Sequence, residues 1–368
     1  MTDTLSPTTP LPNHGAEATV ITPGLTAPKE IPDLHGQPVP LVLRKEDQPV
    51  EGVFQNVCNF RDVGSVVNKG VDKKYLKPRN FFRSGRLDDA TTEDLKLLAE
   101  KYSIKTVIDL RSELEGRMGE QLTNTFPASA IAEHLRIAEL AAIPSEHPPV
   151  EHHREKLAAA GVDGKVVEGR YTYYINFAGK KFRKYSVWKP LSLGTKLKAI
   201  GLMIAHQKPK VVEMVGKEVI GPRGLIGLNK DFVDYCGDEI AQALTLLANP
   251  SNFPVLVHCT QGKDRTGLII AFTLSMCDVP RDVILHDYDL TNEGLLPQRD
   301  VMVEEMRKTG LDSSFSDAPP EVLKQLFEYV EGKWGSVDGY LDSIGVKEDL
   351  RLKIRKNVLG GDAVAGAA

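Results

Sequence analysis

Short apolar runs, bounded by turn residues and charges, recur along the chain and predict buried strands. The clearest are residues 104–110 (IKTVIDL) and 254–257 (PVLV), which are too short for helices and rich in β-branched residues. Residues 80–85 (NFFRSG) predict a third strand that ends in a turn, and residues 131–137 a fourth. Continuous apolar runs of this kind are typical of strands that are covered on both faces.

Apolar side chains at helical spacing predict helices between and after these strands. Thr91 is expected to cap a short helix, with Asp94 three residues on and leucines at 95, 97 and 98. An amphipathic helix is expected at 231–247. Further helices are expected at 197–205, from residue 280 to 290, and in 320–359, where two helices meet around Gly335. The alternation of strands and helices indicates an α/β fold.

Changes in composition set the expected domain limits. Residues 1–40 are rich in Pro, Thr and Gly, so we expect a disordered tail there, and a second tail at 360–368. Residues 41–359 are expected to form a single domain. Within it, residues 144–230 have the least regular pattern, and we interpret them as an insertion.

The overall composition is that of a globular protein, with 368 residues of which 41% are hydrophobic and 26% charged. No run approaches the roughly 20 apolar residues of a membrane-spanning helix, and the first residues lack the features of a secretory signal. We therefore expect a cytoplasmic protein without a transmembrane segment. The net charge of −4 argues against nucleic acid as a partner. It does not argue against an anionic substrate, because a local pocket can be positive.

The four cysteines contain no C-x-x-C pair, so neither a zinc site nor a disulfide framework is predicted. Cys58, Cys236 and Cys277 are interpreted as small buried hydrophobic residues. Cys259 is the exception, because of the sequence around it.

That sequence is HCTQGKDRTG, residues 258–267, which follows the strand 254–257 and leads into a helix expected to begin near Thr266. Free N–H groups at a helix start attract a phosphate dianion, and an arginine offers a planar fork to two of its oxygens. Glycines at 262 and 267 allow close approach of the backbone. The segment predicts a phosphate cradle above a thiolate, made from Thr260, Gln261, Gly262, Lys263, Asp264 and Arg265.

A cysteine in this setting predicts nucleophilic catalysis. A helix start and nearby cations lower the pKa of a thiol, so Cys259 is expected to attack phosphorus and form a phosphocysteine that water then hydrolyses. His258 is expected to order the entrance to the loop, and the Thr266 hydroxyl to hydrogen-bond the departing thiolate. The leaving oxygen needs a proton. Asp264 and Asp231 are both candidates for the donor, and Asp264 is favoured.

The fixed order of His, Cys, Gly, Arg, Thr and Gly is far more specific than a bare C-x5-R spacing. It resembles the signature loop of cysteine-dependent tyrosine phosphatases. Its Lys-Asp interior is similar to that of the atypical tyrosine/serine protein phosphatases of bacteria and fungi. Other stretches that resemble this family are NFRDVG (59–64), FFRSGRL (81–87), TVIDLRSELE (106–115), HDYDLTNE (286–293) and GSVDGYLDSIGV (335–346).

The resemblance implies a tyrosine-phosphatase-like core with a central, mostly parallel sheet flanked by helices. It assigns Cys259 as the nucleophile, Arg265 as the phosphate ligand, Lys263 to the acceptance of phosphoinositides and Asp264 to proton donation. No metal or cofactor is implied. Related enzymes place helices over the pocket as a lid, so residues 144–230 are a candidate helical lid, although they depart from the family's pattern.

Residues outside the loop are candidates for supporting roles. Asp109 and Arg111 end a strand that is expected beside the loop strand, so they either brace the loop or satisfy backbone groups there. Arg61, Asp62 and Arg83 either add charge to the pocket or have a plain surface or structural role.

The basic run at 180–184 lies among aromatic residues. We interpret it as a solvated face, with contact to an anionic membrane or an inositol headgroup as the alternative.

These features predict a phosphatase that acts on phosphotyrosine in proteins, and also on phosphoserine, phosphothreonine or phosphoinositides. An inositol-phosphate or inositol-pyrophosphate phosphatase is the second hypothesis, in which Lys263 lines a wider pocket. A non-catalytic module that binds phosphorylated partners is the third. The intact nucleophile, arginine and candidate acids argue against it.

Overall fold

The computed structural model describes residues 54–112, 115, 120–129 and 169–360, and the backbone of two short strands near the N-terminus. The chain divides into two compact units, Met1–Glu46 and Asp47–Ala368. In the first unit, β1 (Ile31–Pro32) pairs with β2 (Pro38–Val39) in antiparallel fashion. The expected tails lie almost wholly outside the described residues, so the domain limits stay predictions.

Within the described part of the second unit, a sheet of six strands has the order β3-β4-β8-β5-β7-β6. The strands are β3 (Arg61–Asp62), β4 (Phe81–Ser84), β5 (Thr106–Asp109), β6 (Ala128–Ser129), β7 (Tyr171–Tyr174) and β8 (Val255–His258). All neighbours are parallel except β3 and β4. The register pairs Ser84 and Asp109 with His258, so three strands end level with one another just before Cys259. The expected α/β fold with a mostly parallel sheet is confirmed.

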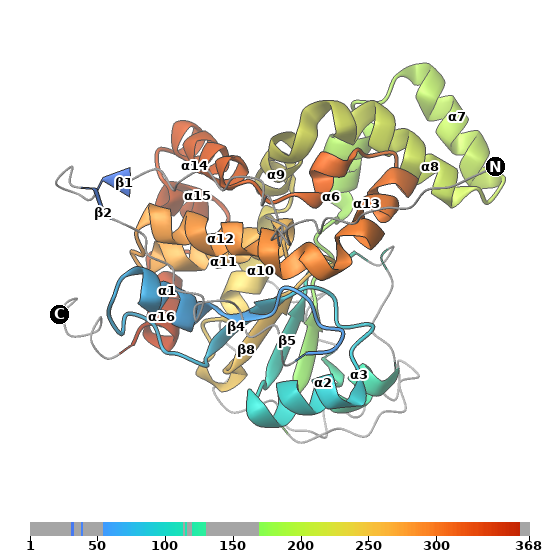
Figure 1. Cartoon of the computed structure of the whole chain (residues 1–368). Helices are drawn as coiled ribbons and strands as arrows, with labels where there is room; N and C mark the ends of the chain where they lie inside the picture. Colours follow the sequence, from blue (N-terminus) through green and yellow to red (C-terminus); the bar gives the residue numbers. More distant parts are fainter. Residues whose placement is uncertain are drawn as a thin grey trace, which may run out of the picture. The chain divides into compact units, whose positions relative to one another are not determined.

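Helices cover both faces of this sheet (Figure 1). Val255 and Val257 of β8 pack in the core that contains Leu244 and Ile269, whereas Leu256 packs on the opposite face with Leu98. This alternation arises because successive side chains of a strand point to opposite faces. Since both faces are covered, every residue of β4, β5 and β8 is buried, which explains the continuous apolar run that begins β8.

The N-terminal half of the second unit contributes α1 (Val63–Gly70), α2 (Thr92–Lys96), the π-helix η2 (Leu97–Lys101) and α3 (Glu120–Thr125). After β7 come α6 (Lys180–Phe182), η4 (Arg183–Trp188), α7 (Leu193–Ile204), α8 (Lys208–Val215), η5 (Gly216–Ile220), η6 (Gly221–Arg223), α9 (Gly224–Tyr235) and α10 (Gly237–Leu246). The remainder comprises η7 (Pro250–Asn252), α11 (Asp264–Met276), α12 (Arg281–Leu295), η8 (Leu296–Gln298), α13 (Arg299–Lys308), η9 (Ser313–Ser316), α14 (Pro320–Trp334), α15 (Val337–Ser343) and α16 (Glu348–Val358).

Several expected elements are present as predicted. Thr91 caps α2 and forms a full capping box with Asp94. The strands expected at 80–85, 104–110 and 254–257 are β4, β5 and β8. The strand expected at 131–137 lies outside the described residues.

Two expectations were wrong. The single helix expected at 231–247 is in fact the end of α9 followed by α10. The helix is interrupted at Cys236, next to Gly237, which lies close to the Ile344 side chain. The Gly-rich stretch before Asp231, for which no helix was predicted, is the first half of α9, since packing outweighs the low helix propensity of glycine. The C-terminal region has three helices, as Gly345 (φ +89°) separates α15 from α16 in addition to the break at Gly335.

Helix α1 was not expected, because its sequence merges into a lysine-rich stretch with turn residues. Asp62 starts it by accepting a hydrogen bond from the Gly64 N–H at 3.0 Å. Asp62 also accepts hydrogen bonds from the Ser65 hydroxyl at 2.5 Å and the Arg79 N–H at 2.7 Å. Burial raises the pKa of this carboxyl. These hydrogen bonds make Asp62 the N-cap of α1 and join it to the backbone at Arg79.

Candidate phosphate-binding site

The loop Cys259–Lys263 joins β8 to α11 at the edge of the sheet where the parallel strands end. Helix α11 begins at Asp264, two residues before the expected start. Cys259 is 3% exposed and forms no disulfide. The thiol therefore lies in the core at the start of a thirteen-residue helix, whose free N–H groups favour an anion.

Three successive carbonyl groups of the loop accept hydrogen bonds from residues just before β3 and just after β4. The Thr260 carbonyl accepts a hydrogen bond from the Arg86 N–H at 2.9 Å. The carbonyls of the next two residues, Gln261 and Gly262, accept hydrogen bonds from the Asn59 side-chain amide at 3.0 and 3.1 Å. Because the N–H and C=O of a trans peptide point in opposite directions, the following N–H groups face away from this scaffold. They are therefore free to line a concave anion site.

A buried ion-pair network supports these contacts. Arg83 donates to the Gly262 carbonyl at 2.6 Å and to Asp287 at 2.5 Å, and Arg61 donates to the other carboxylate oxygen of Asp287 at 2.9 Å. All three side chains are at most 2% exposed. Burial would raise the pKa of Asp287, but the two guanidinium groups outweigh it and lower this pKa to about 2. Arg61 and Arg83 therefore lie behind the loop, as structural cations.

The backbone conformation at position 262 requires glycine. Its φ is +65°, and a Cβ atom there would lie 2.1 Å from the carbonyl oxygen of Ser84. An L side chain would be strained in this conformation and would also collide with β4. Only glycine lets the loop lie this close to the neighbouring strand.

Arg265 makes a two-pronged ion pair with Glu115. Its Nη1 and Nη2 atoms lie 2.7 and 2.6 Å from the two carboxylate oxygens, and Nη1 also donates to the Leu110 carbonyl at 3.1 Å. Glu115 is held in turn by the N–H and hydroxyl of Ser112, at 2.9 and 2.8 Å, and by the hydroxyl of Thr260. Burial opposes the charge of both partners. Their mutual attraction outweighs it, so the pKa of Glu115 is lowered and that of Arg265 raised.

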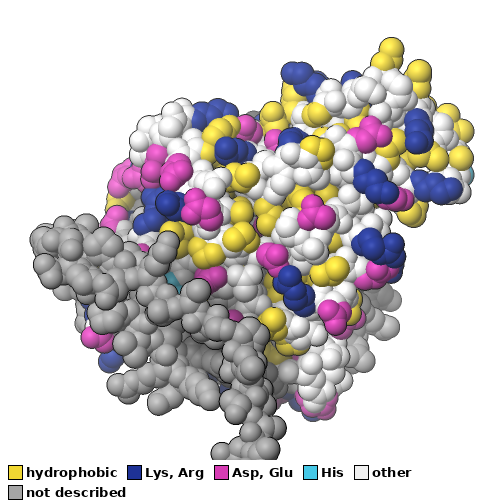
Figure 2. All heavy atoms as spheres, turned by 45° about the horizontal axis from the view of Figure 1, so that its top comes forward, with side chains coloured by type: hydrophobic (Ala, Val, Ile, Leu, Met, Phe, Trp, Pro, Cys, Tyr) yellow, Lys and Arg dark blue, Asp and Glu magenta, His cyan; other side chains and the backbone are white. Residues whose placement is uncertain are grey.

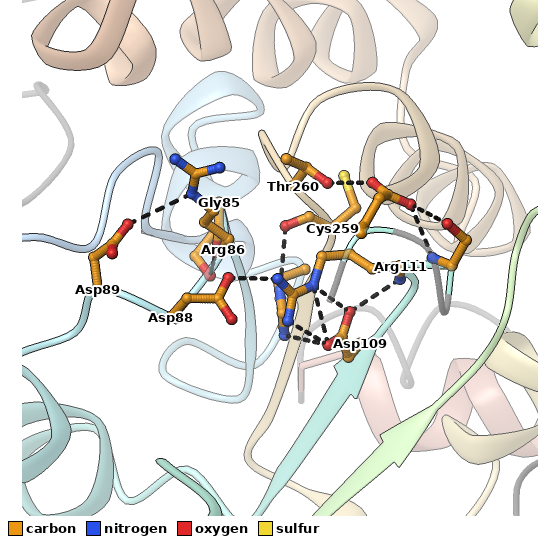
Figure 3. A network of polar contacts seen from close by, with 12 residues as sticks. Gly85, Arg86, Asp88, Asp89, Asp109, Arg111, Cys259 and Thr260 are labelled. Atoms are coloured by element: carbon orange, nitrogen blue, oxygen red, sulfur yellow. Dashed lines mark hydrogen bonds and ion pairs between the residues drawn. The ribbon is translucent and has the colours of Figure 1, made fainter. Parts of the chain in front are cut away.

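Asp109, Arg111 and His258 form a second group beneath the loop. Arg111 lies between Asp109 and Asp88 (Figure 3), and its Nη2 is 2.9 Å from Asp109. The Nε2 atom of His258 is 3.8 Å from Asp109, and its Nδ1 atom lies 3.2 Å from the Cys259 carbonyl. Burial lowers the pKa of His258, which favours the neutral ring. The expected proximity of Asp109 and Arg111 to the loop strand is confirmed, since β5 pairs with β8. The guanidinium of Arg111 forms ion pairs with Asp88 and Asp109.

The two candidate acids have different surroundings. Asp264 lies in the first turn of α11, where its carboxylate is 3.4 Å from the Asn229 amide and 3.6 Å from the Lys263 ammonium. Asp231 points toward η4, accepting a hydrogen bond from the Ser186 hydroxyl at 2.7 Å and pairing with Arg223. Burial raises the pKa of Asp231. The fold thus places Asp264 directly after the loop, in the first turn of α11, and Asp231 in a contact between α9 and the helices that follow β7.

Lys263 at the end of the loop and Thr266 in α11 are fully buried. The Lys263 ammonium donates to the carbonyls of Phe315 and Asp317 at 2.5 and 2.9 Å, so it holds the η9 segment against the loop. The Thr266 hydroxyl has no hydrogen-bond partner among the described residues. A buried hydroxyl without a partner is uncommon, and it leaves a donor available beside the loop.

Two of the other cysteines are structural thiols. Cys236 is buried and donates to the Phe177 carbonyl at 2.8 Å, and burial raises its pKa. Burial also raises the pKa of Cys277 to about 12. These two thiols therefore stay protonated at neutral pH.

Sequence reasoning missed Asn59, Asp287 and Glu115. Each lies within a stretch that resembles the phosphatase family, namely NFRDVG, HDYDLTNE and TVIDLRSELE. That clustering was a usable signal, but residue spacing alone does not reveal that segments more than 200 residues apart meet at Gly262.

Residues 53–360 match the family model described as "Tyrosine phosphatase family". The chain is 31% identical over 135 residues to a triple specificity protein phosphatase, PtpB, of Mycobacterium tuberculosis, which covers 32% of this chain and 48% of that protein. It is 29% identical over 151 residues to a tyrosine-protein phosphatase of Nostoc commune, covering 36% and 50%. It is also 29% identical over 97 residues to the inositol diphosphatase SIW14 of Saccharomyces cerevisiae, covering 25% and 34%. The chain thus spans half, or less, of the length of these relatives.

No helix in the described residues is long and apolar enough to cross a bilayer.

Proposed function

Since the chain belongs to the tyrosine phosphatase family, we propose that it hydrolyses phosphomonoesters through a phosphocysteine formed on Cys259. The observation that carries this proposal is the fixed direction of three loop carbonyls, at Thr260, Gln261 and Gly262. Because these three carbonyls point toward the residues around β3 and β4, the N–H groups that follow them point to the opposite side of the loop. Such a set of preorganised donors stabilises the charge that develops on a phosphoryl group in transfer.

In the first step the Cys259 thiolate attacks phosphorus in line with the leaving oxygen. The S–P bond forms as the P–O bond breaks, and the leaving oxygen takes a proton from the protonated carboxyl of Asp264. The loop N–H groups and the Arg265 guanidinium hold the three other oxygens. In this assignment, Asp264 acts from the first turn of α11, next to the arginine.

In the second step water attacks the phosphocysteine. The Asp264 carboxylate accepts the proton of this water, the S–P bond breaks, and inorganic phosphate and the thiolate are released. The Thr266 hydroxyl, which is buried and without a partner among the described residues, is assigned to donate a hydrogen bond to the departing thiolate. His258 and Asp109 are assigned to hold the strand end that carries Cys259.

The substrate we propose first is phosphotyrosine in a protein, with phosphoserine, phosphothreonine and phosphoinositides as further substrates. Two of the relatives are named for tyrosine or triple specificity. Lys263 supports this order, because its ammonium binds the carbonyls of Phe315 and Asp317 and does not line a wide pocket.

The alternative is an inositol-phosphate or inositol-pyrophosphate phosphatase. It is favoured by relatives that are named as inositol diphosphatases, SIW14 among them. A panel of phosphotyrosyl and phosphoseryl peptides, a phosphoinositide and soluble inositol pyrophosphates separates the two. The proposal predicts the highest kcat/KM on the phosphotyrosyl peptide, and a preference for the inositol compounds would reverse the order.

Turnover of p-nitrophenyl phosphate tests the chemistry itself. Replacing Cys259 by serine should lower kcat by at least about 10³-fold, since the nucleophile is lost. Cys277→Ala, at the far end of the same helix, is the matched control and should keep activity within about twofold. Full activity of Cys259→Ser would refute the mechanism. Tight phosphopeptide binding by the wild type without any turnover would support a non-catalytic binding module instead.

A further inference from the structure

Helix α7 (Leu193–Ile204) presents a row of large aliphatic side chains to solvent. Leu193, Leu197, Ile200 and Ile204 are 76%, 64%, 41% and 75% exposed. Their spacing of four, three and four residues places them in one stripe along the helix. Contiguous exposed apolar surface of this kind marks an interaction site more often than chance exposure does.

The helix itself is well formed and is anchored through its other side. Ser192 caps it by accepting a hydrogen bond from the Thr195 N–H at 3.1 Å. Ala199, on the side opposite the stripe, is 1% exposed, and α7 packs on α8. The stripe is therefore a fixed outward surface of a capped helix at the end of this group of helices (Figure 1).

The sequence around the stripe is rich in basic residues, although Glu218 accepts a hydrogen bond from the Thr195 hydroxyl of α7 at 2.7 Å. Between Tyr171 and Val212 the sequence contains no aspartate or glutamate, whereas the whole chain has a net charge of −4. The basic residues in this interval are Lys180, Lys181, Arg183, Lys184, Lys189, Lys196, Lys198, Lys208 and Lys210. By helical spacing Lys196 borders the stripe on α7, and Lys198 lies farther round the same helix. Figure 2 shows hydrophobic side chains beside Lys and Arg side chains at the upper right, where α7 and α8 lie.

An apolar stripe on a helix whose charged residues are all lysines is the pattern of a helix that lies in a membrane interface. We propose that α7 docks this protein on the surface of a bilayer that contains anionic lipids, with the aliphatic stripe between the headgroups. A second copy of the chain fits this surface less well, because a two-fold contact through the stripe would bring lysines against lysines. The proposal also gives the basic run at 180–184 an anionic surface to approach.

Sedimentation with vesicles tests this docking. The wild type should bind vesicles of phosphatidylcholine with phosphatidylserine, bind vesicles of phosphatidylcholine alone far less, and be released by salt. Leu197→Ser/Ile204→Ser should bind the anionic vesicles at least about tenfold more weakly. Lys196→Gln/Lys198→Gln should bind about 25-fold more weakly, at about fivefold per lysine.

The exposed neighbours Leu352 and Lys353 of α16 provide a matched control. Leu352→Ser/Lys353→Gln should bind like the wild type, and far-ultraviolet circular dichroism should show all variants folded. Cys259→Ser should also bind fully, so failure of the proposed catalysis and failure of docking are distinguishable. The proposal would be overturned if the wild type did not bind anionic vesicles, or if both α7 variants bound them as tightly as the wild type does. A dimer in light scattering that Leu197→Ser/Ile204→Ser dissociates, without vesicle binding, would assign the stripe to a second copy.

Discussion

The guanidinium of Arg83 donates a hydrogen bond of 2.6 Å to the carbonyl oxygen of Gly262, at the centre of the phosphate-binding loop. Its second nitrogen is 2.5 Å from Asp287 on α12. A cation that is fully buried and neutralised by a carboxylate thus fixes the direction of a loop peptide. The loop geometry depends on side chains that never face the substrate.

Asp287→Asn should destabilise the protein strongly, because it leaves Arg61 and Arg83 buried with a neutral amide as their partner. Removing one member of a buried ion pair costs about 3–5 kcal/mol of unfolding free energy. Urea unfolding measures this. Asp289→Asn, two residues along the same helix but exposed, is the control and should change stability by no more than about 0.5 kcal/mol. An equal loss in both variants would contradict the role of the network.

The pH dependence of stability follows from the same carboxylate. Its pKa is about 2 in the folded protein, below the ordinary value of about 3.9 for an unfolded chain. A lowered folded pKa gives stability that is full above about pH 4 and is lost as the pH falls toward 2, by about 2 kcal/mol. Asp287→Asn should therefore show a shallower loss of stability than the wild type between these pH values. Parallel curves for the two proteins would exclude Asp287 as a source of the acid sensitivity.

Gly262→Ala should displace the loop, since the new methyl group would lie 2.1 Å from the Ser84 carbonyl oxygen at a φ of +65°. We expect turnover of p-nitrophenyl phosphate to fall by about 10²-fold or more, because misplacement of about 1 Å costs that much. Gly332→Ala is the comparison, as a methyl group there meets no atom within 4 Å inside α14. It should keep full activity and gain about 0.5–1 kcal/mol of stability. Normal activity of Gly262→Ala would show that the loop tolerates a different backbone.

Glu115→Ala tests what the carboxylate does for Arg265. If it fixes the plane of the guanidinium, as we infer, its removal should lower kcat for p-nitrophenyl phosphate by about 10- to 100-fold. Glu93→Ala, exposed on α2, should have no effect. A rise in kcat/KM of Glu115→Ala would instead mean that the carboxylate competes with the substrate phosphate for the arginine.

Asp264→Asn and Asp231→Asn decide between the two acids. A proton donor matters most when the leaving group is a poor one, so the true acid should lose far more rate on phenyl phosphate than on p-nitrophenyl phosphate. We expect that pattern for Asp264, at about 10²-fold or more on phenyl phosphate. Asp231→Asn should lower both rates about equally and modestly, since Asp231 is bound to Ser186 and Arg223. The reverse pattern would make Asp231 the donor.

The strands and the loop were predictable because their signals are local. The run before His258 is apolar and β-branched, and the spacing from Cys259 to Arg265 with a glycine between them is contiguous in sequence. Thr91 and Asp94, three residues apart, likewise predict the start of α2. Each of these features depends on neighbours within a few residues, so no knowledge of the fold is needed to recognise it.

The supporting network was not predictable from patterns, because its parts are distant in sequence. Arg61 and Asp287 are 226 residues apart, and Arg265 and Glu115 are 150 apart. Local patterns also missed packing that outweighs propensity, as in the Gly-rich start of α9. The orientation of Lys263 is a third case, because only the fold brings the carbonyl of Phe315 to its ammonium.

The central claim is that phosphate is transferred to the sulfur of Cys259, and acid-quenched mass spectrometry tests it most directly. The Asp264→Asn variant is mixed with p-nitrophenyl phosphate, quenched within the first turnover and digested. Phosphocysteine should accumulate in this variant, because breakdown lacks its base while the good leaving group still departs. We predict one added phosphoryl group on the peptide that contains Cys259 and none in Cys259→Ser. Continued turnover of the aryl phosphate with no label on Cys259 would contradict the account.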